Sequence, residues 1–379
     1  MTYMAEIPIN KEILRWAIDD ASLTTESFAR SIQVESRTVE EWLQGDKKPN
    51  KGNMDAAGKV LGRSLQFFFL PTPPDAQSAI RARFRSSLSA ENPDATKQAN
   101  AIRQAERMQK IVTWSNADEG VRSLVPEASA QMSSKTYAEK LKSALGWSLG
   151  RQKARSKSQN YKELRRQIEA LNVLTVARKI GESSCRGFSI SSSDAPLIFI
   201  NTDYKSPALR TFTLLHELAH LGHGSSSVCF NSDSDAEVWC NKVAADFLLP
   251  EDELRTYISS RDFTQANAHN TEPVRFVANY FKVSWLAAAI RLKSIGMADQ
   301  SAVEFIQDHP LVDHDDGFDP NGEARTLPIH RFDEFGINFP LAIFKAVGRE
   351  RLTALEASRM LRADSGQLLQ LQALVEQAR

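Results

Sequence analysis

The sequence has few cysteines, no surplus of charge and no long apolar run. Its 379 residues include three cysteines, Cys185, Cys229 and Cys240, an odd number without Cys-x-x-Cys spacing. This pattern argues against a disulfide framework and against a thiolate zinc cluster, and it fits a reducing compartment. No stretch approaches the roughly 18 apolar residues that span a bilayer, and residues 1–10 lack the basic start and apolar run of a secretion signal. We therefore expect a cytoplasmic protein with no membrane segment.

Acidic and basic residues balance at 47 each, so no overall charge draws the chain toward nucleic acid or a membrane surface. The balance differs along the chain, because residues 81–166 hold 18 Lys or Arg against 8 Asp or Glu. The most basic section runs from Arg151 to Arg166. A solvated helix face is the simplest explanation, and a surface for nucleic acid or an acidic partner is the alternative.

Two short helices are predicted near the N-terminus. Thr24 or Thr25 can cap a helix that buries Phe28, Ala29 and Ile32, and a turn at residues 33–35 leads into a second helix over residues 36–43. The second helix has a polar start and an apolar Val39/Trp42/Leu43 face, and Gly45 closes it. This stretch resembles the XRE-type helix-turn-helix, which is related to Cro and repressor proteins. The resemblance covers about sixty residues.

That resemblance implies a DNA-reading face on the second helix. Four side chains would face the major groove and two lysines would lie near phosphates: Ser36, Arg37, Thr38 and Glu41, then Lys47 and Lys48. However, this unit is not basic, and acidic residues at positions 35, 40 and 41 would repel phosphate. Operator binding and a protein-docking or dimerisation module, which would give a homodimer, are therefore both open.

The chain is too long for one ordinary core, so we expect several domains. Phe67–Leu70 followed by three prolines marks a boundary near residue 70, and residues 71–170 are predicted as a basic helical connector. Short β-rich runs follow at residues 173–177, 187–190 and 197–200, and a helix then runs from Ser206 to Gly222. Helices continue to Arg379. The expected fold is α+β and mainly helical.

The helix at residues 206–222 carries His216-Glu217-Leu218-Ala219-His220, an H-E-x-x-H motif. Residues four apart lie on one face of a helix, so both imidazoles can reach a single ion while Glu217 lies beside it. Zinc favours imidazole and carboxylate ligands, and a site with three protein ligands leaves a position for water. Glu217 would act as general base on that water. The simpler explanation, a surface helix with incidental histidines, is weakened by the apolar residues around the motif.

A third ligand must come from another element. The next predicted helix, at residues 234–249, offers Glu237 near its start, and 17 residues from His220 are enough for this helix to fold back against the first. Competing ligands are His223, Asp233 and Asp235. Glu237 is the ligand that we predict.

The motif and its surroundings resemble the ImmA/IrrE family of metallopeptidases. The resemblance rests on residues 210–220 together with Glu237, Cys240, Asn241, two alanines and Leu248-Leu249-Pro250, in a chain that also carries the helix-turn-helix pattern. It implies a gluzincin-like zinc site of His216, His220 and Glu237, with Glu217 as the catalytic glutamate. It also implies a metallopeptidase domain at residues 171–300, between a helix-turn-helix domain at 1–70 with its connector and a helical C-terminal region at 301–379. Cys240 departs from the family pattern, which usually has alanine there.

The family resemblance implies regulatory proteolysis of a protein partner such as a transcriptional repressor. The alternative is an antitoxin or transcriptional regulator that binds a toxin and operator DNA, with a metal site that is structural or vestigial. The motifs do not identify the group that would stabilise an oxyanion. Candidates for that role are Tyr204, Arg210, His223 and His269.

Overall fold

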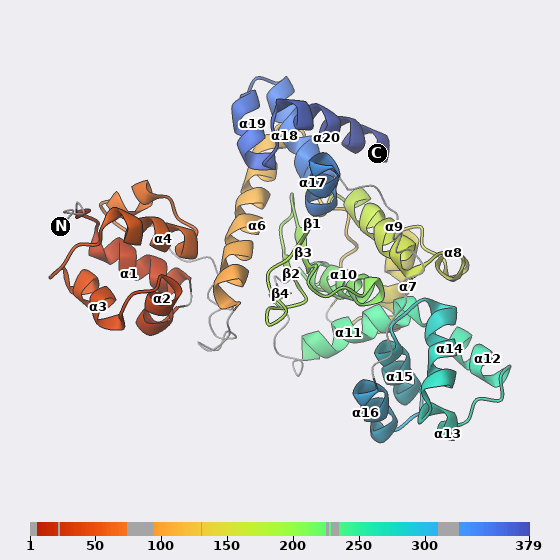
Figure 1. Ribbon diagram of the computed structural model, residues 1–379. Helices are drawn as coiled ribbons and strands as arrows, with labels where there is room; N and C mark the ends of the chain where they lie inside the picture. The colour runs from red at the N-terminus through yellow and green to blue at the C-terminus, as the bar shows by residue number, and fades with distance from the viewer. Residues whose placement is uncertain are drawn as a thin grey trace. The chain divides into compact units, whose positions relative to one another are not determined.

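The computed structural model describes residues 6–21, 23–73, 94–129, 131–224, 227–228, 235–309 and 326–379. Cys229, Asp233 and residues 74–93 of the predicted connector lie outside these ranges. The chain forms two compact units: unit 1 is Met1–Arg107 with Ile180–Cys185, and unit 2 is Met108–Lys179 with Arg186–Arg379. The described residues are mainly helical and include one small sheet, as an α+β fold requires (Figure 1). None of the described helices is long and apolar enough to cross a membrane.

Unit 1 contains helices α1 (Lys11–Asp20), α2 (Thr25–Ser31), α3 (Ser36–Gln44) and α4 (Lys51–Leu61), the 3-10 turn η1 (Leu65–Phe69) and the start of α6 (Ala95–Ser115). Local signals set the helix ends. Thr24 and Ser27 form a capping box at the start of α2, and Gly45, in the left-handed conformation, ends α3. The core of this unit consists of fully or almost fully buried apolar side chains, including Ile13, Leu14, Phe28, Val39, Trp42, Met54 and Phe68.

A buried ion-pair cluster links α1 to the segment after α4 and to α6 within unit 1. The carboxylate of Asp20, at the end of α1, receives Arg63 at 2.8 Å and Arg103 at 2.7 Å. The Asp20 side chain is fully buried and that of Arg103 is 8% exposed. Removing one partner of a buried ion pair leaves a charge without compensation, which usually costs more than the pair itself contributes.

We therefore expect Asp20→Ala to lower the free energy of unfolding of unit 1 by about 3 to 5 kcal/mol. The neighbouring Asp19, which is exposed, provides the matched control Asp19→Ala. Urea denaturation followed by the fluorescence of Trp16 and Trp42 measures both variants. Equal midpoints for the two variants would contradict a structural role for the cluster.

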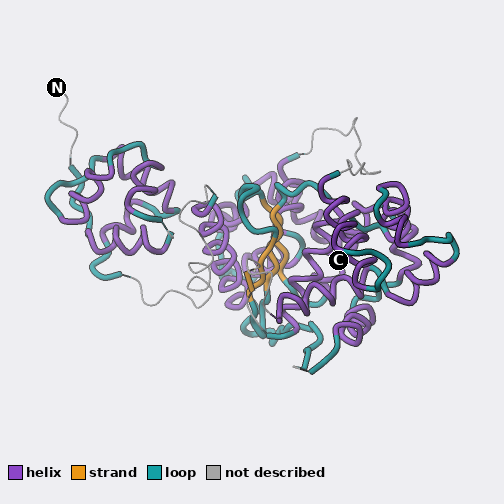
Figure 2. The backbone as a smooth tube through the Cα atoms, turned by 90° about the horizontal axis from the view of Figure 1, so that it is seen from below, coloured by secondary structure: helices purple, strands orange, loops and turns teal. Residues whose placement is uncertain are grey.

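Unit 2 is built around a four-stranded sheet in the order β1-β3-β2-β4 (Figure 2). The strands are β1 (Leu174–Arg178), β2 (Gly187–Ile190), β3 (Leu197–Asn201) and the two-residue β4 (Ser227–Val228). β1 pairs with β3 in parallel, whereas β2 pairs with β3 and β4 antiparallel. The described strand residues of β2 and β3 are buried throughout, so both faces of the sheet are covered. Figure 1 shows α10 (Pro207–Gly222) on one face and the C-terminal part of α6 beside the other.

The helices before the sheet belong to the core of unit 2. These are α7 (Ser134–Ala144), α8 (Leu149–Ala154) and α9 (Lys157–Ala170). Tyr137, Leu141, Leu164 and Ile168 are buried in one cluster with residues of α10 and α11 (Asp235–Leu248). The sequence predicted a connector up to residue 170, because the many Lys, Arg and Gln side chains of this segment obscure its apolar stripe. The structure instead places residues 134–170 within the packed unit.

Five more helices follow α11, namely α12 (Glu251–Ser259), α13 (Gln265–Ala268), α14 (Thr271–Phe281), α15 (Trp285–Ser294) and α16 (Gln300–Asp308). After residues 310–325, which are not described, come α17 (Leu327–Phe335), α18 (Asn338–Gly348), α19 (Ala354–Leu361) and α20 (Ser365–Ala378). α17 and α18 pack against β1, the edge strand. In this C-terminal region Leu361 and Leu368 are buried and Leu355 is 60% exposed.

Candidate metal centre

Helix α10 presents the H-E-x-x-H motif from the interior of unit 2. Ser206 caps the helix by accepting a hydrogen bond from the Leu209 amide, and Pro207 occupies the first helical position. Leu214, Leu215 and Leu218 are fully buried, so the helix is fixed by packing on several sides. The polar residues of the motif are therefore held in a largely apolar environment, where polar groups need partners.

Helix α11 supplies the carboxylate. Glu237 Oε2 lies 3.0 Å from His216 Nε2, and Glu237 Oε1 lies 3.2 Å from His220 Nε2. The two Nε2 atoms are 3.1 Å apart. Among the described residues, these three side chains are the group whose ligand atoms could hold a metal ion, all within 4.8 Å of one another.

The spacing of these atoms fits a tetrahedral metal ion. Ligand atoms at about 2.0 to 2.2 Å from a zinc ion, in tetrahedral geometry, are separated by roughly 3.3 to 3.6 Å. The distances of 3.0 to 3.2 Å are close to this value. Two imidazole nitrogens that face each other and a carboxylate also form a donor set that suits a divalent cation. The three side chains thus fit a metal centre with three protein ligands.

The charges within the group support one another. Burial raises the pKa of Glu237, but the hydrogen bonds from His216 and His220 outweigh it, so the pKa of this carboxyl is far below its usual range. Burial lowers the pKa of His216, yet the hydrogen bond and charge of Glu237 together with the charge of Glu217 raise it overall. The Glu237 carboxyl is therefore ionised at neutral pH, as a metal ligand would have to be.

Glu217 is fully buried and lies against the sheet. Strand β2 approaches α10 so closely at Gly187 that an added Cβ would lie 2.6 Å from Thr213 Cγ2 and 2.8 Å from the Phe199 carbonyl oxygen. The same Cβ would lie 3.5 Å from Glu217 Cγ. A glycine at this position allows the strand to support Glu217 directly.

We expect Gly187→Ala to lower the free energy of unfolding by roughly 1 to 3 kcal/mol, because β2 and α10 must separate to admit the methyl group. Metal affinity should fall with it, because α10 carries two of the three ligands. Gly150→Ala, at a helical position with open space around it, is the matched control. Thermal denaturation and zinc titration of both variants measure these effects. Wild-type values for Gly187→Ala would show that the close approach is unimportant.

The competing ligands lie outside the group. His223, at the end of α10, packs edge-on against Trp239 with ring centroids 4.2 Å apart. Burial and the charge of His220 lower the pKa of His223. Asp235 is exposed at the start of α11, and Asp233 falls outside the described residues. Of the ligands predicted from sequence, the structure brings together His216, His220 and Glu237.

The residues proposed from sequence to stabilise an oxyanion lie at different places relative to the metal centre. Arg210 donates hydrogen bonds to the carbonyls of Thr202 and Tyr204, at 2.9 and 2.7 Å, and so holds the turn after β3. His269 lies 3.4 Å from Asp299, far along the chain from the motif helix. His223, one turn beyond His220, is the candidate on the same helix face as both histidine ligands.

The six residues predicted to contact DNA all lie in unit 1, on α3 and in the loop after it. Glu41 pairs with Lys47 at 2.7 Å and with Arg37 at 3.6 Å. Ser36 and Thr38 are half-buried, whereas Lys47 and Lys48 are exposed. The metal centre lies wholly in unit 2.

Two residues near the metal centre, Asn241 and Cys240, carry part of the family resemblance but were not predicted as site residues. Asn241 lies beside His216 and contributes to raising the pKa of its imidazole. It follows Glu237 by four residues, and that spacing, which places both on one face of α11, is the signal that could have identified it. Cys240 is fully buried, and burial together with the charges of Glu237 and Glu217 raises the pKa of its thiol. Cys240 is thus a neutral packing residue beside the site.

A buried H-E-x-x-H helix, a carboxylate from the following helix and a supporting sheet are features typical of a metallopeptidase-type domain. Residues 168–293 match the family model of the IrrE N-terminal-like domain, Peptidase_M78. The match covers the sheet, the motif helix and the helix that carries Glu237, and it supports the ImmA/IrrE family for this domain. No curated protein and no solved structure matches the chain.

Proposed function

We propose that the protein is a zinc-dependent regulatory metallopeptidase that cleaves a protein partner such as a transcriptional repressor. The observation that carries this proposal is the convergence of His216, His220 and Glu237 from two helices. The buried Glu217 follows the first of these ligands on α10. A purely structural site would need the three ligands but not this glutamate.

Each residue then has a distinct role. His216, His220 and Glu237 would hold the ion, and Asn241, beside His216, would help to orient its ring. A bound zinc ion would act as a Lewis acid that polarises the scissile carbonyl and makes water more acidic. Glu217 would accept a proton from the attacking water and deliver it to the leaving amine.

Substrate trapping tests this proposal. Glu217→Gln, which keeps the shape of the side chain but cannot accept the proton, should retain a bound substrate that the wild-type protein releases as fragments. Proteins that crosslink to the variant in its native host are identified, purified and incubated with wild-type protein and zinc. Intact mass should show cleavage at one site, and chelation should abolish it. A partner that binds both forms and is never cut would refute proteolysis.

A second candidate function is operator binding by unit 1. The observation in its favour is the pairing of Glu41 with Lys47 and Arg37, which neutralises an acidic side chain on the predicted reading face. Arg37 is 84% exposed in its side chain and could exchange Glu41 for a base edge. If unit 1 reads DNA, Arg37→Ala should weaken binding to the promoter of its own gene more than Asp55→Ala, a substitution on α4. Salt-independent or undetectable binding would exclude this function.

An antitoxin role without proteolysis is the alternative to the enzyme. In that case Glu217→Gln should be silent in a growth-rescue assay against a neighbouring toxin, whereas surface substitutions should matter. Leu355 and Leu369 are 60% and 71% exposed, so Leu355→Ser with Leu369→Ser changes the C-terminal surface without opening its core. Rescue that depends on these leucines and not on Glu217 would favour occlusion of a toxin.

A further inference from the structure

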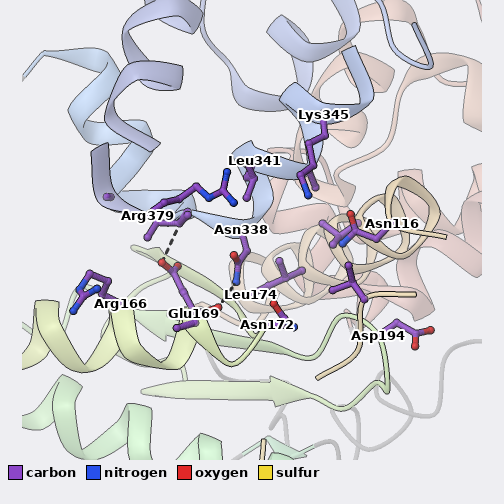
Figure 3. A pocket seen from close by; sticks show the side chains of 16 residues that line it. Asn116, Arg166, Glu169, Asn172, Leu174, Asp194, Asn338, Leu341, Lys345 and Arg379 are labelled. Atoms are coloured by element: carbon purple, nitrogen blue, oxygen red, sulfur yellow. Dashed lines mark hydrogen bonds between the residues drawn. The ribbon is translucent and has the colours of Figure 1, made fainter. Parts of the chain in front are cut away.

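Unit 2 contains a cavity apart from the candidate metal centre. It is formed by α6, α9, β1 and the C-terminal helices. Its volume is about 280 Å³, roughly nine water volumes at about 30 Å³ each, which is enough for a small organic molecule. Neither the three side chains of the candidate metal centre nor Glu217 lines it. Figure 3 shows Arg166 and Arg379 on one side of the cavity and Lys345 on the other, with Leu174 and Asn338 between them.

The walls of this cavity combine apolar and polar surface. Leu174, Ile337 and Leu341 come from the start of β1 and from the α18 segment and supply apolar contacts. The Glu169 carboxylate also lines the cavity, but its oxygens accept hydrogen bonds from the Thr175 hydroxyl and the Ile337 amide. Apolar contacts beside a few fixed polar groups are common in small-molecule sites.

The charge around the mouth is positive. Glu163 is shared by Arg166 at 3.0 Å and Arg155 at 3.6 Å. Glu119 is likewise shared by Lys345 at 2.9 Å and Arg349 at 2.6 Å.

Each carboxylate therefore faces two cations. Asp194, the other acidic lining residue, accepts a hydrogen bond from the Ser193 hydroxyl. Burial raises the pKa of Glu169, and the charge of Arg165 with the two hydrogen bonds opposes this effect. Arg379 also lines the cavity, so its lining side chains comprise three cations, Arg166, Lys345 and Arg379, and two carboxylates, Glu169 and Asp194, a surplus that suits one negative charge.

We propose that this cavity is a binding site for a small organic carboxylate with an apolar body. Arg166 or Lys345, on opposite sides of the cavity, would pair with the carboxylate, and Leu174, Ile337 and Leu341 would contact the apolar part. A phosphate monoester, with about two negative charges, matches the charge surplus less well. A ligand here would touch α9, which packs on the motif helix α10, and α18 of the C-terminal region. The bound molecule would therefore stabilise the packing of that region against the metallopeptidase domain.

Three probes with matched bodies test the assignment on the full chain. Hexanoate has a carboxylate and an apolar chain. Hexylammonium has the same apolar chain with a positive charge, and acetate has the carboxylate without the chain. Hexanoate should raise the melting temperature in a saturable way and give a calorimetric binding isotherm, because a ligand that binds only the folded state stabilises it. Hexylammonium should do neither, and acetate should bind at least about tenfold more weakly because it lacks most of the apolar contact.

Variants locate the site. Arg166→Gln with Lys345→Gln should raise the Kd for hexanoate at least tenfold, since each charge-assisted hydrogen bond contributes about 1.5 to 3 kcal/mol. Lys162→Gln, an exposed position on α9 outside the cavity, is the matched control and should leave the Kd unchanged. Arg166→Gln alone, at a side chain that is 49% exposed, guards against misfolding of the double variant. Equal effects of hexanoate and hexylammonium, or equal Kd values for the cavity and control variants, would overturn the proposal.

Discussion

Glu217→Gln is expected to lower the rate of substrate cleavage about 10²- to 10⁴-fold while zinc remains bound. The amide keeps the volume of the side chain in a fully buried position but cannot accept a proton from water. The three ligand side chains are unchanged, so their convergence should persist. The measurement is single-turnover cleavage of the trapped partner together with zinc content by atomic spectrometry.

Glu127→Gln, an exposed substitution elsewhere in unit 2, controls for a change of charge alone and should cleave at the wild-type rate. Loss of zinc from Glu217→Gln would mean that this residue is a ligand. Full activity of the variant would mean that it is not the base.

Glu237→Ala is expected to weaken zinc binding at least about 100-fold. Substitutions that only disturb the surroundings of a metal ligand already cost 10- to 100-fold, and this change removes a ligand together with its negative charge. Glu237 also compensates both buried histidines, at 3.0 and 3.2 Å. Competition titration with a chromogenic chelator measures the affinity.

Asp235→Ala tests the same helix without touching the group, since Asp235 is exposed in the first turn of α11. Its zinc affinity should equal that of the wild type. If zinc bound more weakly to Asp235→Ala than to Glu237→Ala, Asp235 and not Glu237 would be the third ligand.

The motif helix could be predicted in detail because its signals are local. Ser206 and Pro207 fix where α10 begins, and the four-residue spacing of His216 and His220 fixes their shared face. The third ligand could only be ranked against competitors, since its position depends on how α11 packs on α10. The match of residues 168–293 to the IrrE N-terminal-like domain supports the family but assigns no role to individual residues.

Features that depend on contacts between distant segments were not predictable. Gly187 lies in a short β-rich run like many others, and its approach to Glu217 exists only once β2 is placed beside α10. For the basic segment at residues 151–166 the sequence left two explanations open, a solvated helix face and a surface for nucleic acid or an acidic partner. The structure shows Arg165 bonded to Thr175 on β1, and Arg155 and Arg166 paired with Glu163, so much of its charge serves contacts within unit 2.

The metal content of the purified protein tests the central claim most directly. Wild-type protein prepared without added chelator should carry about one zinc ion per chain, and the double variant His216→Ala with His220→Ala should carry none, because two of the three ligands are gone. Circular dichroism of both samples confirms that the helices persist, and His330→Ala, on α17, controls for the loss of a histidine elsewhere. Full metal retention in the double variant would contradict the site and, with it, the metallopeptidase function that we propose.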